Sequence, residues 1–294
     1  MRAFYKPLGI LVLAGSVGFL LFIVISAGAF NSGSADAGAA NMARAQADNN
    51  TMSKINAQAA LDAEFAGRLA EASRKAELPA DIAERLTRLA SDPGFRAELA
   101  AVLAQPAYLR ALVDPWRALP ADFSPPDLVA LEGGFYRISR NDLRLRRVAA
   151  VALDEMARAA HADGLWLVAS SSYRSYDYQA QVHERLVSQM GREAAMRVSA
   201  RPGHSQHQTG LVLDFGSIDN SFARTAEGIW MAENSGLFGW SLSYPDGMEH
   251  ITGYSWESWH FRYLGRELAR FKERHFEGVQ QFALRFLYEW ELLL

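Results

Sequence analysis

Apolar residues recur at helical spacing through the first half of the chain. Two stretches, residues 82–89 and 95–103, place large apolar side chains three or four residues apart, on one face of a helix. Between them, Asp92 and Pro93 have the residue types that begin a helix, a side-chain cap followed by proline in the first turn. The pattern predicts a helical spacer region over residues 64–113.

The second half alternates helical patterns with short apolar runs. One helix is predicted from a cap at Asn141 or Asp142 to Gly164, and another over residues 176–190, before Gly191. Short apolar runs bounded by turn residues are typical of strands, and they cover residues 165–170, 211–215, 240–244 and 259–263. Because the strands gather behind a helical first half, we expect an α+β domain over residues 114–270.

Two segments border the strand-bearing part of the chain. Residues 114–131 contain four prolines, which predicts an extended segment on the surface of the domain that follows. Residues 271–294 predict a C-terminal helical tail whose aromatic side chains pack back on the protein.

The N-terminus has the pattern of a membrane segment. Residues 8–30 carry no charge, and as a helix they would span roughly 35 Å, enough to cross a bilayer. Arg2 and Lys6 precede this run, so we expect the N-terminus to stay in the cytoplasm and the rest of the chain to be exported. A cleaved signal peptide is the alternative, because small residues at 27–29 suit a peptidase.

Residues 31–63 differ in composition from the segments on either side. They are rich in Ala, Asn, Ser, Gly and Asp and hold few large apolar residues, a composition that buries too little surface to offset chain entropy. We expect a flexible tether there, with helix allowed in its Ala-rich second half.

Composition narrows the chemistry that is available. The formal net charge of the 294 residues is -3, which argues against broad electrostatic binding to nucleic acid. Cysteine is absent, so the chain has no disulfide framework, thiol nucleophile or thiolate metal ligand. A metal site would have to use His, Asp and Glu.

Two short motifs offer such ligands. His207 and Asp214 lie seven residues apart in PGHSQHQTGLVLD, which suits a turn followed by a strand that returns to the same point. Taken alone, the pair also fits a cap or a hydrogen-bonded turn. Glu257 and His260 lie three apart in ESWH, where aromatic neighbours favour a strand with Glu257 at a bend before it. Two histidines, an aspartate and a spare glutamate are the ligands and base of a catalytic zinc.

Arg174 follows the apolar run at residues 165–170. An arginine at such a position commonly forms a structural ion pair. Its fixed fork of donors would alternatively bind a substrate carboxylate or the oxyanion of amide hydrolysis.

Three separated blocks resemble the signature of the VanY-like D-alanyl-D-alanine carboxypeptidases. This group of bacterial cell-wall zinc peptidases also includes L,D-carboxypeptidases and D-Ala-D-Ala dipeptidases. The blocks are Tyr173-Arg174-Ser175 with Gln179, SQHQTGLVLD at 205–214 and TGYSWESWHFRYLG at 252–265. The resemblance covers residues 113–267 and leaves out the anchor, tether and spacer. Val212 and Ser243 depart from the family pattern, which usually has Ala and often Arg there.

The resemblance implies a role for each polar member of the blocks. It makes His207, Asp214 and His260 the ligands of Zn²⁺. Glu257 would be the catalytic base, and Arg174 would act in both catalysis and substrate binding. The other implied substrate-binding residues are Tyr173, Gln179 and Ser205.

The resemblance also implies a fold and a function. The fold would be a small antiparallel sheet flanked by helices, of the hedgehog/DD-peptidase type. The function would be removal of the terminal D-alanine from peptidoglycan stem peptides, outside the bacterial cytoplasmic membrane. Alternatives are an L,D-carboxypeptidase, a cross-link endopeptidase or a non-catalytic cell-wall-binding protein. Partners other than stem peptides and the membrane are not indicated.

Overall fold

The computed structural model describes residues 35–294. The chain divides into two units after residue 55, and every strand found among the described residues lies in the second unit, residues 56–294. The predicted membrane anchor, residues 1–30, lies outside the described residues. From residue 35 onward, no helix combines the length and apolar content needed to cross a bilayer.

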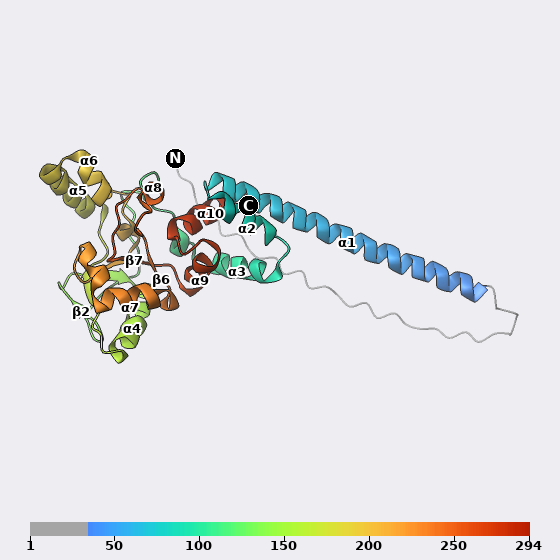
Figure 1. Cartoon of the computed structure of the whole chain (residues 1–294), viewed down its shortest axis with the longest axis horizontal. Helices are drawn as coiled ribbons and strands as arrows, with labels where there is room; N and C mark the ends of the chain where they lie inside the picture. The colour runs from blue at the N-terminus through green and yellow to red at the C-terminus, as the bar shows by residue number, and fades with distance from the viewer. Residues whose placement is uncertain (1–34) are drawn as a thin grey trace. The chain divides into compact units, whose positions relative to one another are not determined.

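The second unit contains a small, mainly antiparallel sheet, which lies near α4 and α7 in Figure 1. Its five strands, in spatial order, are β2 (Arg137–Ile138), β4 (Val168–Ser171), β5 (Val212–Phe215), β7 (His260–Tyr263) and β6 (Trp240–Leu242). Only the β2–β4 pair is parallel. A separate antiparallel pair is formed by β1 (Leu128–Ala130) and β3 (Arg144–Arg146). The predicted α+β class with a small antiparallel sheet is therefore confirmed.

The two faces of the sheet have different surroundings. Side chains alternate along a strand, so the register partners Leu213 and Phe261 share one face, and Asp214 and His260 share the other. Leu213 and Phe261 are buried in a core with Leu153 of the helix α4 (Arg147–Ala162). The opposite face carries the polar residues of the candidate site.

Helices and short turns surround the sheet. Besides α4, the α-helices beside it are α5 (Tyr176–Met190), α6 (Arg192–Val198), α7 (Ala226–Asn234) and α8 (Glu249–Thr252). The 3-10 turns are η1 (Ala107–Arg110), η2 (Gln206–Thr209), η3 (Asn220–Arg224) and η4 (Ser235–Phe238). The helix predicted over residues 176–190 coincides with α5.

The predicted start of α4 is wrong. The cap was expected at Asn141 or Asp142, but the helix begins at Arg147. Residues before it form β3, where Leu145 pairs with Val129 of β1. Leu145 fits the helical spacing of the following apolar residues, but its backbone hydrogen bonds go to a neighbouring strand.

A second apolar core joins the two ends of this unit. Its helices are α1 (Ala35–Lys75), α2 (Ala80–Arg88), α3 (Pro93–Ala104), α9 (Arg266–His275) and α10 (Gln280–Leu292). Leu69, Ile82 and Phe95 from the first three pack with Phe271 and Phe286 from the last two. The region expected as a spacer and the expected C-terminal tail thus share one core.

The N-terminus of α3 and the length of α1 can be compared with what the sequence predicts. The Asp92 side chain caps α3 by accepting a hydrogen bond from Phe95 N, as expected. Helix α1 begins at Ala35, so it includes most of the segment expected as a flexible tether. That segment contains no proline, and its many alanines favour helix even where side chains at 40–60 are exposed.

Arg262 of β7 connects the sheet to the chain that precedes it. Its guanidinium is fully buried and donates hydrogen bonds to the carbonyl oxygens of Leu109 and Ala111. Burial lowers the pKa of Arg262 to about 10.

Candidate metal centre

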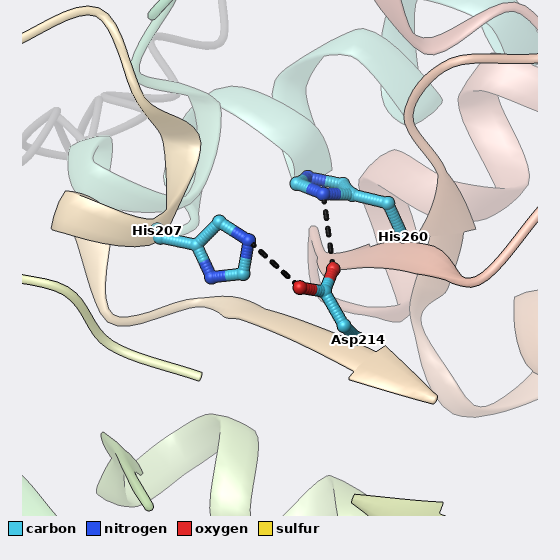
Figure 2. Close-up of side chains that lie close together, drawn as sticks. All are labelled: His207, Asp214 and His260. Carbon is cyan, nitrogen blue, oxygen red and sulfur yellow. Dashed lines mark ion pairs between the residues drawn. The ribbon is translucent and has the colours of Figure 1, made fainter. Parts of the chain in front are cut away.

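Three side chains predicted as ligands converge in the structure. His207 Nε2 lies 3.3 Å from one carboxylate oxygen of Asp214, and His260 Nδ1 lies 3.2 Å from the other (Figure 2). One ligand atom from each residue lies within 4.8 Å of the other two, and all three residues are buried. Within residues 35–294, this is the one group of three or more His, Asp or Glu side chains placed closely enough to hold a metal ion.

The sheet and one turn set these positions. Asp214 and His260 are direct register partners on β5 and β7, so backbone hydrogen bonds fix their separation. His207 lies in η2, which ends at Gly210 in the left-handed region with φ 69°. A Cβ at position 210 would lie 2.9 Å from the Leu128 side chain, so glycine is required there for both conformation and space.

A backbone carbonyl orients His207. Its Nδ1 lies 2.6 Å from Ser172 O, so Nδ1 carries the proton and donates it. Burial and the nearby Arg174 cation together lower the pKa of His207 to about 4, although Asp214 acts in the opposite direction. A neutral ring with Nδ1 protonated leaves the Nε2 lone pair free to face Asp214.

The other two members are charged in the metal-free site. Burial would lower the pKa of His260, but the nearby Asp214 and Glu257 carboxylates outweigh it and raise the pKa to about 9. Burial would raise the pKa of Asp214, but both imidazoles outweigh it and hold the pKa well below its usual range. An anionic Asp214 therefore lies between two imidazoles.

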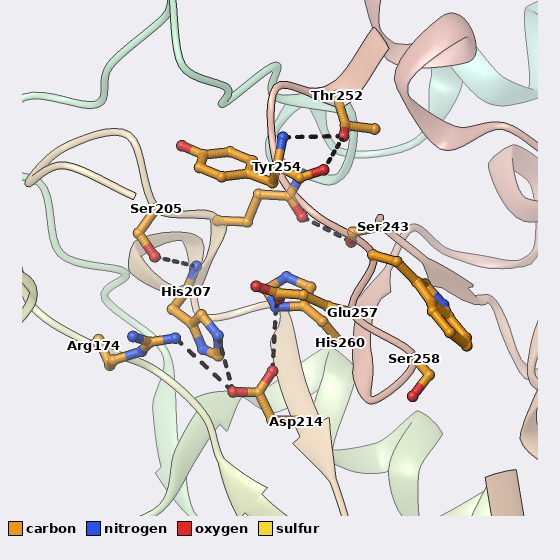
Figure 3. Close-up of polar contacts among 12 residues, drawn as sticks. Arg174, Ser205, His207, Asp214, Ser243, Thr252, Tyr254, Glu257, Ser258 and His260 are labelled. Carbon is orange, nitrogen blue, oxygen red and sulfur yellow. Dashed lines mark hydrogen bonds and ion pairs between the residues drawn. The ribbon is translucent and has the colours of Figure 1, made fainter. Parts of the chain in front are cut away.

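Glu257 lies beside this group. Its Oε2 is 3.2 Å from His260 Nδ1, and the residue precedes β7 on a segment without regular structure, as expected (Figure 3). Its backbone N–H donates to Tyr244 O, which holds this segment against the end of β6. The carboxylate thus faces the ligand group without belonging to it.

Three of the predicted substrate-binding residues, Arg174, Gln179 and Ser205, line a cavity together with His207 and His260. Arg174 Nη1 donates to Gln179 Oε1 at 3.0 Å, and Arg174 Nη2 lies 3.9 Å from an Asp214 oxygen. Arg174 Nε is buried without a hydrogen-bond partner, which leaves a donor unused. Ser205 Oγ accepts from His207 N at 3.3 Å and so caps the η2 turn.

Tyr173 lies apart from these residues. Its hydroxyl is 3.2 Å from Ser124 Oγ, and its side chain lines a neighbouring cavity of about 190 Å³ that also borders Arg174. The structure therefore does not bring Tyr173 to the ligand group.

The cavity at the ligand group is small. Its volume is about 40 Å³, and its walls include Arg174, Glu257, Tyr244 and Tyr254. Tyr254 was not singled out in the sequence, because nothing distinguishes it from the other aromatic residues around it. A cavity of about 780 Å³ lies elsewhere, lined by Trp240 among others, but no metal-ligating group borders it.

The donor set fits a metal ion. His207 Nε2 and Asp214 Oδ1 are buried and close to other ligand atoms, yet neither makes a hydrogen bond of proper geometry. Buried polar atoms without partners are costly unless something else satisfies them. Two imidazoles and a carboxylate are ligands that suit a catalytic zinc with an open position.

Comparison with known proteins places this site in a family. The family model described as "VanY: D-alanyl-D-alanine carboxypeptidase" matches residues 142–266, which include every residue of the ligand group. The Bacillus subtilis protein YodJ is 37% identical over 190 residues, covering 60% of this chain and 70% of YodJ. A D-alanyl-D-alanine carboxypeptidase of Enterococcus faecium is 32% identical over 143 residues, but only 45% of that enzyme is covered.

Solved structures agree with the sequence matches. The LdcB LD-carboxypeptidase is 36% identical with a TM-score of 0.53, covering 58% of this chain and 86% of that one. A mutant of the D,D-pentapeptidase VanY in complex with Zn(II) is 28% identical with a TM-score of 0.51. The match covers 60% of this chain and 99% of the VanY chain.

The fold, the convergent ligand group and these matches lead to one assignment. The chain belongs to the VanY family of D-alanyl-D-alanine carboxypeptidases and is a metallopeptidase.

Proposed function

We propose that this protein is a zinc-dependent D,D-carboxypeptidase that removes the terminal D-alanine of peptidoglycan stem peptides. The observation that carries the proposal is Glu257, a carboxylate 3.2 Å from His260 beside a complete set of three ligands. A structural metal site has no use for an extra carboxylate, whereas a hydrolytic site needs a base. This also argues against a non-catalytic wall-binding protein.

The chain's own residues fit the chemistry of amide hydrolysis. His207, Asp214 and His260 would hold zinc, which when bound supplies a Lewis acid that acidifies water and polarises a carbonyl. Glu257 accepts the proton of the attacking water and passes it to the leaving amine of D-alanine.

Arg174 has the donors needed to bind the substrate. Its Nε has no partner, while Gln179 holds Nη1. The guanidinium can therefore take either the terminal carboxylate of the peptide or the negative charge that develops on the carbonyl oxygen. Binding of a free carboxylate favours a carboxypeptidase over a cross-link endopeptidase.

An L,D-carboxypeptidase is the second candidate. LdcB, an LD-carboxypeptidase, is 36% identical to this chain, against 28% for the VanY mutant. Both activities release D-alanine and differ in the configuration of the residue before it.

Digestion of defined peptides tests the proposal. We expect the zinc-loaded protein to release D-alanine from a stem pentapeptide, and a chelator to abolish release, with products identified by mass. Cleavage of the tetrapeptide alone would select the L,D activity, and cleavage of a cross-linked dimer would select an endopeptidase. Absence of cleavage of all three substrates would overturn the proposal.

Zinc binding is expected to strengthen as the pH rises. In the metal-free protein the pKa of His260 is about 9, so His260 carries a proton at pH 7 that zinc must displace. Apparent affinity should therefore rise about tenfold per pH unit between pH 7 and 9 and then level off. His207 contributes nothing in this range, because its pKa of about 4 leaves it neutral. Titration against a competing chelator measures this, and an affinity that is constant from pH 7 to 9 would contradict it.

The proposed substrate lies outside the cytoplasmic membrane. We propose that the chain is exported there, anchored with its N-terminus inside or released by cleavage, and the support is the uncharged run at residues 8–30. Fractionation of cells carrying a tagged C-terminus tests this.

A further inference from the structure

A chain of buried hydrogen bonds runs from helix α10 to the candidate metal centre. Gln280, the first residue of α10, donates from Nε2 to Ser243 Oγ at 3.2 Å. Ser243 Oγ donates in turn to Gln206 Oε1 at 2.9 Å. The three residues are 0%, 2% and 1% exposed, so water does not compete for these bonds.

Ser243 connects the segments that carry both imidazole ligands. Gln206 immediately precedes His207 in the η2 turn, and the backbone N–H of Ser243 donates to His260 O at 3.1 Å. A shift of the Ser243 hydroxyl would therefore change the position of one ligand relative to the other.

The chemistry of the hydroxyl makes Gln280 necessary. A serine hydroxyl has one proton, and here it is given to Gln206, so its lone pair needs a donor from elsewhere. The Gln280 amide supplies that donor. An apolar side chain at position 280 would leave this buried lone pair without a donor and would remove the contact that holds Ser243 from the side of α10.

Gln280 is not explained by stability alone. Its Oε1 is buried without a hydrogen-bond partner, so only one end of the amide is satisfied. A half-satisfied buried amide is less favourable than an apolar side chain of the same shape. Its presence at the end of the hydrogen-bond chain points to a role in the geometry of the site.

We infer that Gln280 is a positioning residue for the metal centre, acting through Ser243 on the turn that holds His207. The inference rests on the proposed zinc centre. It brings helix α10, which lies outside the segment that matches the family, into the construction of the site.

The full chain with Gln280→Met tests this against a matched control. The neighbouring Gln281 is also buried, at 2% exposure, but its Nε2 donates to Asp114 Oδ2 and makes no bond to Ser243 or Gln206. We expect Gln280→Met to weaken zinc binding about tenfold, the lower end of the effect of partners that hold metal ligands. It should also shift the visible spectrum of the Co²⁺-substituted protein. Gln281→Met should change neither, even if it lowers the melting temperature by a similar amount.

A second variant and the wild-type protein distinguish failure of the Gln280 inference from failure of the proposed zinc centre. Ser243→Ala removes both side-chain bonds but keeps the backbone bond to His260, so it should reproduce the effects of Gln280→Met if that variant does not fold. Wild-type zinc affinity and an unchanged Co²⁺ spectrum in either folded variant would overturn the inference. A wild-type protein that binds neither metal would overturn the proposed zinc centre instead.

Discussion

Replacing Glu257 by glutamine is expected to lower kcat about a thousandfold while one zinc ion stays bound. Glutamine keeps the size of the side chain but cannot accept the proton of the attacking water. General acid–base groups contribute about 10²- to 10⁴-fold, and Glu257 would serve in both directions of proton transfer. Release of D-alanine from the stem peptide, measured together with metal content, tests both parts of this prediction.

A nearby glutamate provides the control for this variant. Glu249 in α8 is partly exposed and pairs with Arg197, away from the ligand group. Glu249→Gln should keep wild-type turnover. Full turnover in Glu257→Gln would remove Glu257 from the reaction and leave the site without an assigned base.

Replacing His260 by alanine is expected to abolish activity through loss of the metal. The change removes one of three ligands, so zinc affinity should fall by more than the roughly 10- to 100-fold typical of residues that only support a ligand. It also leaves the anionic Asp214 with one imidazole partner instead of two. Zinc content after dialysis, measured by elemental analysis, should fall from one equivalent towards zero.

His250 is the matched control for the second variant. It lies ten residues earlier, on α8, and is exposed. His250→Ala should keep both zinc and activity. Stoichiometric, wild-type zinc binding by His260→Ala would show that the ligand set is wrong.

The two variants together separate binding from chemistry. Glu257→Gln should bind zinc without turnover, and His260→Ala should lose both. The same loss of metal in both variants would instead mean that Glu257 is needed to form the site.

The sequence predicted the residues of the candidate site more completely than it predicted the strands around them. The spacing of His207 and Asp214, with Glu257 and His260 later in the chain, limits the possible ligands to a few residues because the chain has no cysteine. Periodicity did not show that Asp214 and His260 are register partners, because strand pairing joins segments 46 residues apart. The short strands β1, β2 and β3 were not predicted, since two or three residues are too few to show an alternating pattern.

The contribution of α10 could not have been predicted at all. Gln280 meets Ser243 across 37 residues, and glutamine at the start of a helix has no distinctive pattern. Ser243 departs from the family pattern, but its hydrogen-bond partners depend on how α10 packs. Tertiary contacts of this kind are not encoded in local spacing.

The buried guanidinium of Arg262 has a practical consequence for choosing fragments to express. Residues 142–266 suffice to recognise the family, but Arg262 within them binds carbonyl oxygens at positions 109 and 111, outside them. A fragment cut to the recognised segment would leave a cation without its acceptors in the same strand as His260. The region that identifies the enzyme is therefore shorter than the region that must be produced to obtain a folded one.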